Sequence, residues 1–184
     1  MKIRPRVFIY SIAVSCVILF LINLPKLLED RHEVINETDI YREEINFIQK
    51  GIAISEKNKE FKKCIKLHKM ALQTFNKHLP NEYTDIVRTM NNLAGAYLDD
   101  KQHSMATVMF LKAIEYAEAN KVKDEHFAVL LNNISNCYKL IDNHKEALKW
   151  AERASPYYEM FYGAESEETE ILKGNIEFLK DSIQ

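Results

Sequence analysis

Two stretches of the sequence decide the fold: MNNLAGAYLDDKQHSMATVMFLKAIEYAE, residues 90–118, and LNNISNCYKLIDNHKEALKWAERASPYYE, residues 131–159. They align at a constant offset of 41 residues. Identical pairs at that offset include Asn92 with Asn133, Tyr97 with Tyr138, His103 with His144, Ala106 with Ala147, and Ala113 with Ala154. So many matches at a single offset indicate that the two stretches are copies of one structural unit.

The unit recurs on both sides of these copies. Phe61, Cys64 and Ala71 lie 42 residues before His103, Ala106 and Ala113. After the second copy, the segment 172–176 (LKGNI) lies 42 residues beyond 130–134 (LLNNI). The sequence therefore predicts three complete units and one trailing helix.

Each unit contains two apolar patterns at helical spacing, with a short polar turn between them. The predicted helices are residues 41–57, 60–78, 83–99, 103–119, 124–140, 144–161 and 166–182. Pro80 is expected at a helix boundary and Pro156 at a kink, while Asn81 and Ser166 are typical helix-start residues. Small residues recur where paired helices would cross, at Ala94 or Ser135, Ala106 or Ala147, and Ala113 or Ala154. A larger side chain there would hold the backbones apart.

Composition agrees with an all-α fold. The 184 residues include only four Gly and four Pro, whereas a fold rich in β-turns draws heavily on both. The 25 Lys and Arg are balanced by 27 Asp and Glu, so no basic excess is available for nucleic acid. The three cysteines, Cys16, Cys64 and Cys137, are too scattered for a disulfide framework or a zinc site.

The N-terminal part predicts a membrane anchor. Residues 7–24 (VFIYSIAVSCVILFLINL) contain no charge and follow a short basic tail, residues 1–6. A helix of that length spans roughly 27 Å, close to the hydrocarbon thickness of a bilayer. Residues 25–40 are charged and weakly periodic, which is typical of a stalk. The repeat domain is then expected at 41–184, with repeats at about 41–79, 83–119 and 124–161 and a capping helix at 166–182.

Two alternatives to an uncleaved anchor remain open. One is a cleaved secretory signal, although the sequence has no small-x-small cleavage site after the apolar run. The other is a lipoprotein at Cys16, although eight further, mostly apolar residues follow that cysteine, where a processed lipoprotein normally becomes polar. Lys2, Arg4 and Arg6 precede the span, and only Lys26 and Arg31 follow closely. The positive-inside rule then places the N-terminus on the cytoplasm-like side. The repeat domain is expected on the opposite side, in a bacterial periplasm, a mitochondrial intermembrane space or a lumen.

The alternation of small and aromatic positions resembles the tetratricopeptide repeat, on Ala94, Tyr97, Ala106 and Ala113. The 41–42-residue period and the starts Asn91-Asn92-Leu93-Ala94 and Leu131-Asn132-Asn133-Ile134 are most similar to the longer repeats of kinesin light chains. The resemblance covers residues 41–184. It departs from the family where Ser55 stands at the usual aromatic position and where Trp is absent from the repeat starts. The resemblance implies an α-solenoid whose first helices line a concave groove for an extended peptide or a partner helix.

The resemblance also implies which residues face that groove. They are Gln49 and Ala53 in the first unit, Arg88, Asn91, Asn92 and Gly95 in the second, and Val129, Asn132, Asn133 and Asn136 in the third. Carboxamides donate and accept hydrogen bonds, so a row of Asn can pair with a peptide backbone; alternatively, one Asn of each pair bonds its own scaffold. Among the related clamps for acidic C-termini several of these positions are basic, and here only Arg88 is, so that clamp is not expected.

No signature of chemistry accompanies the repeats. The sequence lacks a Gly-rich phosphate loop, a Gly-x-Ser-x-Gly elbow and a His-Glu-x-x-His motif. We expect no catalytic residues, no metal site, no cofactor and no small-molecule substrate, and a protein or peptide as the partner. Two function classes follow. The first is a membrane-anchored adaptor that holds a partner near the bilayer, for example for a membrane protease, translocase or assembly machine; the second is a permanent structural or assembly subunit of a larger membrane complex.

Overall fold

The computed structural model describes residues 36–183. The basic tail, the expected span at 7–24 and most of the expected stalk lie outside the described residues. Between residues 36 and 183, none of the helices combines the length and the hydropathy that crossing a membrane requires.

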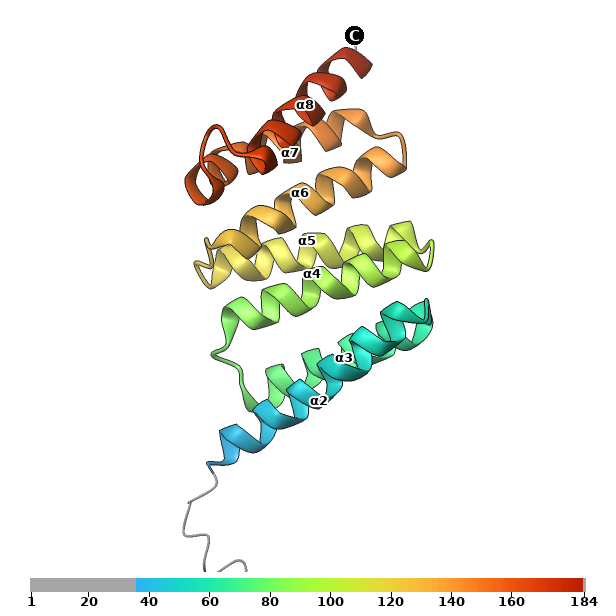
Figure 1. Ribbon diagram of the computed structural model, residues 1–184, viewed down its shortest axis with the longest axis vertical. Coiled ribbons are helices and arrows are strands. Elements are labelled where there is room, and N and C mark those ends of the chain that lie inside the picture. The colour runs from blue at the N-terminus through green and yellow to red at the C-terminus, as the bar shows by residue number, and fades with distance from the viewer. Residues whose placement is uncertain (1–35, 184) are drawn as a thin grey trace, which may run out of the picture. The chain divides into compact units, whose positions relative to one another are not determined.

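Seven α-helices make up the described part of the chain, joined by short turns. They are α2 (Glu37–Lys57), α3 (Phe61–His78), α4 (Tyr83–Asp99), α5 (His103–Ala119), α6 (Glu125–Leu140), α7 (His144–Tyr162) and α8 (Glu167–Ser182). Successive helices pair as antiparallel hairpins, and the hairpins stack from α2–α3 through α6–α7, with α8 packed on α7 (Figure 1). The expected all-α repeat architecture, three hairpins and a capping helix, is confirmed.

Small residues occupy the places where the helices approach one another. Ala94, Ala106, Ala113, Ala147 and Ala154 all have 0% exposed surface. In the third hairpin Ser135 replaces the alanine, and its hydroxyl donates to the Ala147 carbonyl at 2.8 Å, which joins α6 to α7. The polar replacement is therefore satisfied inside the core, as a buried hydroxyl requires.

The three hairpin turns are built alike and contain no glycine. Lys59, Lys101 and Asp142 have φ of 56°, 62° and 57°, so one residue per turn is left-handed. The next backbone N–H donates to a carbonyl five residues earlier: Glu60 to Ser55 at 2.8 Å, Gln102 to Tyr97 at 2.8 Å, and Asn143 to Tyr138 at 3.0 Å. This arrangement satisfies the last carbonyls of each first helix and reverses the chain.

Several predicted boundaries need correction. Helix α2 begins at Glu37, inside the expected stalk, where the Asn36 side chain accepts a hydrogen bond from the Thr38 N–H at 3.2 Å. Asn81 does not cap α4, because the residue before that helix is Glu82 and no side chain caps it. Ser166 does cap α8, since its hydroxyl accepts from the Thr169 N–H at 3.2 Å. Pro80 lies between α3 and α4, as expected, and Pro156 lies inside α7, which continues on both sides of it.

A histidine is buried in the first hairpin. His68 of α3 is 4% exposed, and removal from water lowers its pKa from the ordinary 6.5 to about 4. The Glu56 carboxylate of α2 lies 4.0 Å from His68 Nε2. Because that carboxylate is exposed and at the limit of an ion pair, it offsets little of the desolvation. His68 is therefore neutral in the folded protein at neutral pH.

Burial of neutral His68 predicts a loss of stability in acid. Below pH 6.5 the unfolded chain gains a proton at this residue that the folded protein gains only near pH 4, so the free energy of unfolding falls across that window. The full effect is about 3 kcal/mol, at about 1.4 kcal/mol per pH unit. Urea unfolding at pH 7, 6, 5 and 4 should show a steeper fall for the native sequence than for His68→Met. Parallel pH profiles for the two proteins would contradict this account.

Candidate peptide-binding groove

Six of the ten residues expected in the groove line two cavities, to which α2, α3 and α4 contribute, joined in the second by α6. The first, of about 290 Å³, is lined by Gln49 and Arg88, and we call it the Arg42 cavity after the arginine at its edge. The second, of about 300 Å³, is lined by Asn91, Asn92, Gly95 and Asn133, and we call it the Asn92 cavity. The two cavities share the α4 helix, on which Arg88 and Asn92 are one helical turn apart.

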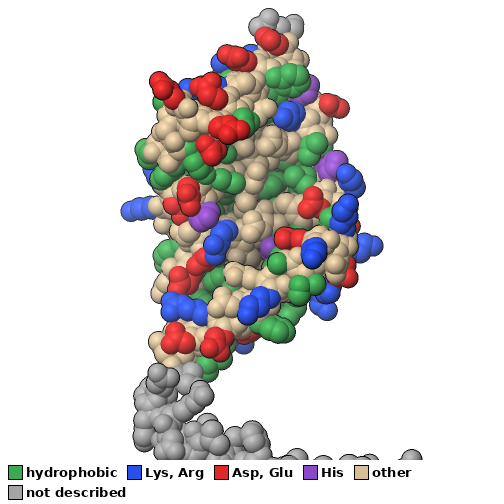
Figure 2. All heavy atoms as spheres, in the orientation of Figure 1, with side chains coloured by type: hydrophobic (Ala, Val, Ile, Leu, Met, Phe, Trp, Pro, Cys, Tyr) green, Lys and Arg blue, Asp and Glu red, His purple; other side chains and the backbone are tan. Residues whose placement is uncertain are grey.

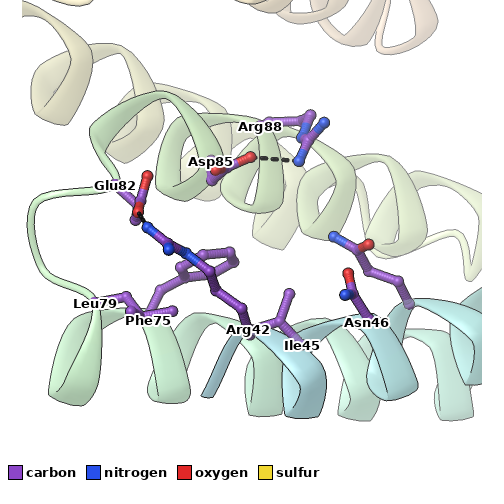
Figure 3. A pocket seen from close by; sticks show the side chains of 9 residues that line it. Arg42, Ile45, Asn46, Phe75, Leu79, Glu82, Asp85 and Arg88 are labelled. Carbon is purple, nitrogen blue, oxygen red and sulfur yellow. Dashed lines mark hydrogen bonds and ion pairs between the residues drawn. The ribbon is translucent and has the colours of Figure 1, made fainter. Parts of the chain in front are cut away.

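In the Arg42 cavity the basic groups are paired with acids. Arg42 Nη2 lies 2.6 Å from Glu82 Oε1, and Arg88 forms an ion pair with Asp85 one turn earlier on α4 (Figure 3). Apolar side chains complete the wall: Ile45 of α2, Phe75 at the end of α3, and Leu79. Because each arginine faces a carboxylate, this cavity does not form a concentrated positive site for an anionic ligand.

In the Asn92 cavity three carboxamides form a chain across two repeats. Asn133 Nδ2 of α6 donates to Asn91 Oδ1 of α4 at 3.0 Å, and Asn91 Nδ2 approaches Asn92 Oδ1 at 3.4 Å. Asn91 and Asn133 are half-buried, whereas Asn92 is exposed. The Asn91 and Asn133 side chains thus hold each other in place, and Asn92, the last of the three carboxamides, is the one that is open to solvent.

The rim of the Asn92 cavity is acidic. Glu56 at the end of α2 and Asp99 at the end of α4 line it together with Phe61 and Cys64. Burial raises the pKa of the Cys64 thiol, and the neighbouring Glu56 and Asp99 carboxylates raise it further. The thiol therefore stays protonated at neutral pH and is a poor nucleophile. The carboxamides of this cavity can form hydrogen bonds with a ligand, and the Glu56 and Asp99 carboxylates beside them can pair with a cationic side chain.

The other expected groove residues lie outside these cavities. Burial raises the pKa of Tyr158 of α7, and the nearby Asn132 side chain of α6 partly offsets that effect. Asn132 therefore supports the α6–α7 hairpin. Asn136, on the same helix, is half-buried and lines neither cavity.

The groove also has charged ends that were not among the residues expected from the sequence. Arg42 and Glu56 lie seven residues before and after Gln49 on α2, and Asp85 and Asp99 lie seven residues before and after Asn92 on α4. Residues seven apart lie on one face of a helix, so the spacing already contained the signal. On the face shown in Figure 2, acidic side chains gather towards the α7–α8 end.

The geometry favours noncovalent binding of an extended ligand. Among residues 36–183, no group of three or more His, Cys, Asp and Glu side chains is placed to hold a metal ion. The carboxamides supply donors and acceptors that match a peptide backbone, and the flanking carboxylates supply negative charge.

The hydrogen bond between Asn91 and Asn133 predicts an energetic coupling between neighbouring repeats. In a double-mutant cycle with Asn91→Ala, Asn133→Ala and the double variant, we expect a coupling of about 0.5–1.5 kcal/mol in the free energy of unfolding. The pair Asn76→Ala and Asn133→Ala, in which Asn76 is an exposed residue of α3, should show a coupling near zero. Strict additivity of Asn91→Ala and Asn133→Ala would show that this bond does not join the repeats.

Comparisons with known proteins agree with the helical-repeat fold. The sequence pattern of the tetratricopeptide repeat matches residues 86–119, which cover most of α4, the turn after it and all of α5. No curated protein matches the chain. Among solved structures, BtubC (BKLC) from P. vanneervenii is 17% identical with a TM-score of 0.68, and the match covers 74% of this chain and 54% of BtubC. The apo form of RapI is 20% identical with a TM-score of 0.68, and the match covers 93% of this chain and 58% of RapI.

A third similar structure is a putative kinesin light chain from Podospora anserina with nearly identical TPR-like repeats. It is 12% identical with a TM-score of 0.64, and the match covers 81% of this chain and 69% of that one. The chain thus spans little more than half the length of BtubC and RapI, and identities this low establish a shared fold alone. Residues 86–119 therefore carry a tetratricopeptide repeat, and the described residues have the helical-repeat fold of tetratricopeptide-repeat proteins, with a kinesin-light-chain-type structure among their neighbours.

Proposed function

We propose that this protein is a membrane-anchored adaptor whose groove binds an extended segment of a protein partner and holds it beside the membrane. A tetratricopeptide-repeat domain is a scaffold for protein–protein interaction. The observation that carries the proposal is the Asn92 cavity. There, Asn133 donates to Asn91, Asn91 approaches Asn92, and Asn92 itself lines the cavity and is exposed to solvent.

The charges around the cavity define the partner further. Glu56 and Asp99 favour a segment with a Lys or Arg beside the backbone stretch that Asn92 reads. The same two carboxylates disfavour an acidic C-terminus. The arginines of the neighbouring cavity do not reverse this preference, because Arg42 and Arg88 are paired with Glu82 and Asp85.

The anchor is proposed from the uncharged run at residues 7–24, with the domain on the side opposite the cytoplasm. A membrane anchor would allow the groove to bind its partner with low affinity. A tethered module meets a membrane-bound partner at a high effective concentration, so a contact of modest affinity is sufficient. An ancillary factor of a membrane protease, translocase or assembly machine has to bind a partner beside the membrane in this way.

The alternative is a permanent subunit of a larger membrane complex. One observation favours it: Met105, Val108 and Leu111 of α5 are 46%, 47% and 39% exposed, on the second helix of a hairpin and away from both cavities. A permanent interface would cover such side chains. The two functions differ in which face the partner needs.

Capture of partners from membranes in mild detergent tests both functions. For an adaptor, partners are substoichiometric, and the triple variant Glu56→Gln, Asp99→Asn, Asn92→Ala should reduce their recovery at least tenfold, since each lost hydrogen bond contributes about 0.5–1.5 kcal/mol. The control Asn76→Ala should recover partners as the native protein does. A stoichiometric complex that survives high salt, tolerates the triple variant and is lost with Val108→Asp would contradict the adaptor and support the subunit.

The same membranes test the anchor. The protein should stay in the pellet after alkaline carbonate extraction, and the repeat domain should resist protease until the compartment is opened. Release by carbonate would contradict the anchor. Cleavage of the domain in intact organelles or spheroplasts would reverse the proposed orientation, as in import receptors that face the cytosol.

A further inference from the structure

Helix α2 presents an apolar line that the repeat geometry leaves uncovered. Ile40, Phe47 and Ile54 are spaced by seven residues, so they lie along one side of the helix. Their exposed fractions are 50%, 77% and 59%. No other described helix exposes three large apolar side chains at this spacing.

The repeat shows what this line normally contacts. The positions equivalent to Phe47 and Ile54 are Thr89 and Ala96 in α4, Leu130 and Cys137 in α6, and Leu172 and Leu179 in α8, and each is at most 8% exposed. They face the second helix of the preceding hairpin, as the 3.3 Å contact between Cys137 and Thr107 of α5 shows. Phe47 and Ile54 of α2 thus lie on the side of the helix that would pack against a preceding hairpin. Within residues 36–183 no hairpin precedes α2, so this side stays exposed.

The charged residues beside this apolar line are arranged so that they can pair with the same residues of a second α2 helix. Glu43 and Lys50 are also seven residues apart, so both lie on the same flank of the Ile40–Phe47–Ile54 line. Both side chains are exposed, and neither has an ion-pair partner within the described residues. If a second α2 packs antiparallel with Phe47 against Phe47, Ile40 meets Ile54 of the second copy. Glu43 then lies opposite residue 51 of the second copy, one residue from Lys50 of that copy and on the same flank of the helix pair.

From this self-complementarity we infer that the protein forms a two-fold symmetric dimer through the α2 face. The two-fold axis passes beside Phe47, and symmetry makes two identical pairs between Glu43 and Lys50. The second copy replaces the hairpin that covers the equivalent face elsewhere in the stack. The groove cavities of each copy lie on other sides of α2 and remain open.

A charge-swap experiment on the full chain in mild detergent tests this dimer. Sedimentation across a concentration series should show the native protein dimerising, and Phe47→Asp should abolish the dimer. Glu43→Lys and Lys50→Glu should each weaken association at least about tenfold, which corresponds to about 1.4 kcal/mol. An equimolar mixture of these two variants should form a heterodimer, because one chain then presents lysines at both positions and the other presents glutamates. Met160→Asp, at a residue of α7 that is 72% exposed, should leave the native dimer intact.

Three results would overturn the inference. A native protein that stays monomeric throughout the series would show that another segment of the same chain, or nothing, covers the α2 face. A dimer that persists with Phe47→Asp would place the interface elsewhere, including the apolar run at 7–24. Failure of the mixed variants to associate would exclude the antiparallel register, while recovery of groove partners by monomeric variants tests the adaptor function separately.

Discussion

Close approach of helix backbones is the constraint on which the rest of this molecule depends. Helices can pack with their axes near together only where the crossing points carry small side chains. Here those points are alanines with no exposed surface, including Ala106, Ala113, Ala147 and Ala154. Their repetition every 41–42 residues brings α4 beside α6 closely enough for Asn133 to bond Asn91, so the geometry of the candidate site follows from the packing of the core.

The fold was predictable because helical periodicity and the small residues recur together. The helices agree with the predicted ones to within one residue at nearly every end. The exceptions have local causes: α2 starts four residues early because Asn36 can accept the Thr38 N–H, and Asn81 is one residue too far from α4 to cap it. Scarcity of glycine indicated helices correctly, yet it concealed how the turns are made, since Lys and Asp occupy the left-handed position at a modest energetic cost.

The candidate site was less predictable than the fold. The 41-residue offset aligns Asn91 with Asn132 and Asn92 with Asn133, which suggests equal roles for each pair. In three dimensions Asn133 bonds Asn91, 42 residues earlier, and Asn132 is engaged by Tyr158. Alignment of the repeats predicts which face of its helix an Asn lies on. It does not predict which Asn of the neighbouring repeat the side chain will bond. The acidic ends of the groove at Glu56 and Asp99 follow from seven-residue spacing, and their meeting at one cavity depends on how α2 stacks on α4.

The role of the small side chains can be measured from the stability of a variant at one crossing point. Replacing Ala113 with Leu inserts three carbon atoms between packed helices, so we expect the free energy of unfolding to fall by about 1–3 kcal/mol. Ala119→Leu, at an exposed residue of the same helix, should change it by less than about 0.5 kcal/mol. Equal stabilities for Ala113→Leu and the native protein would contradict the claim that small side chains set the spacing of these helices.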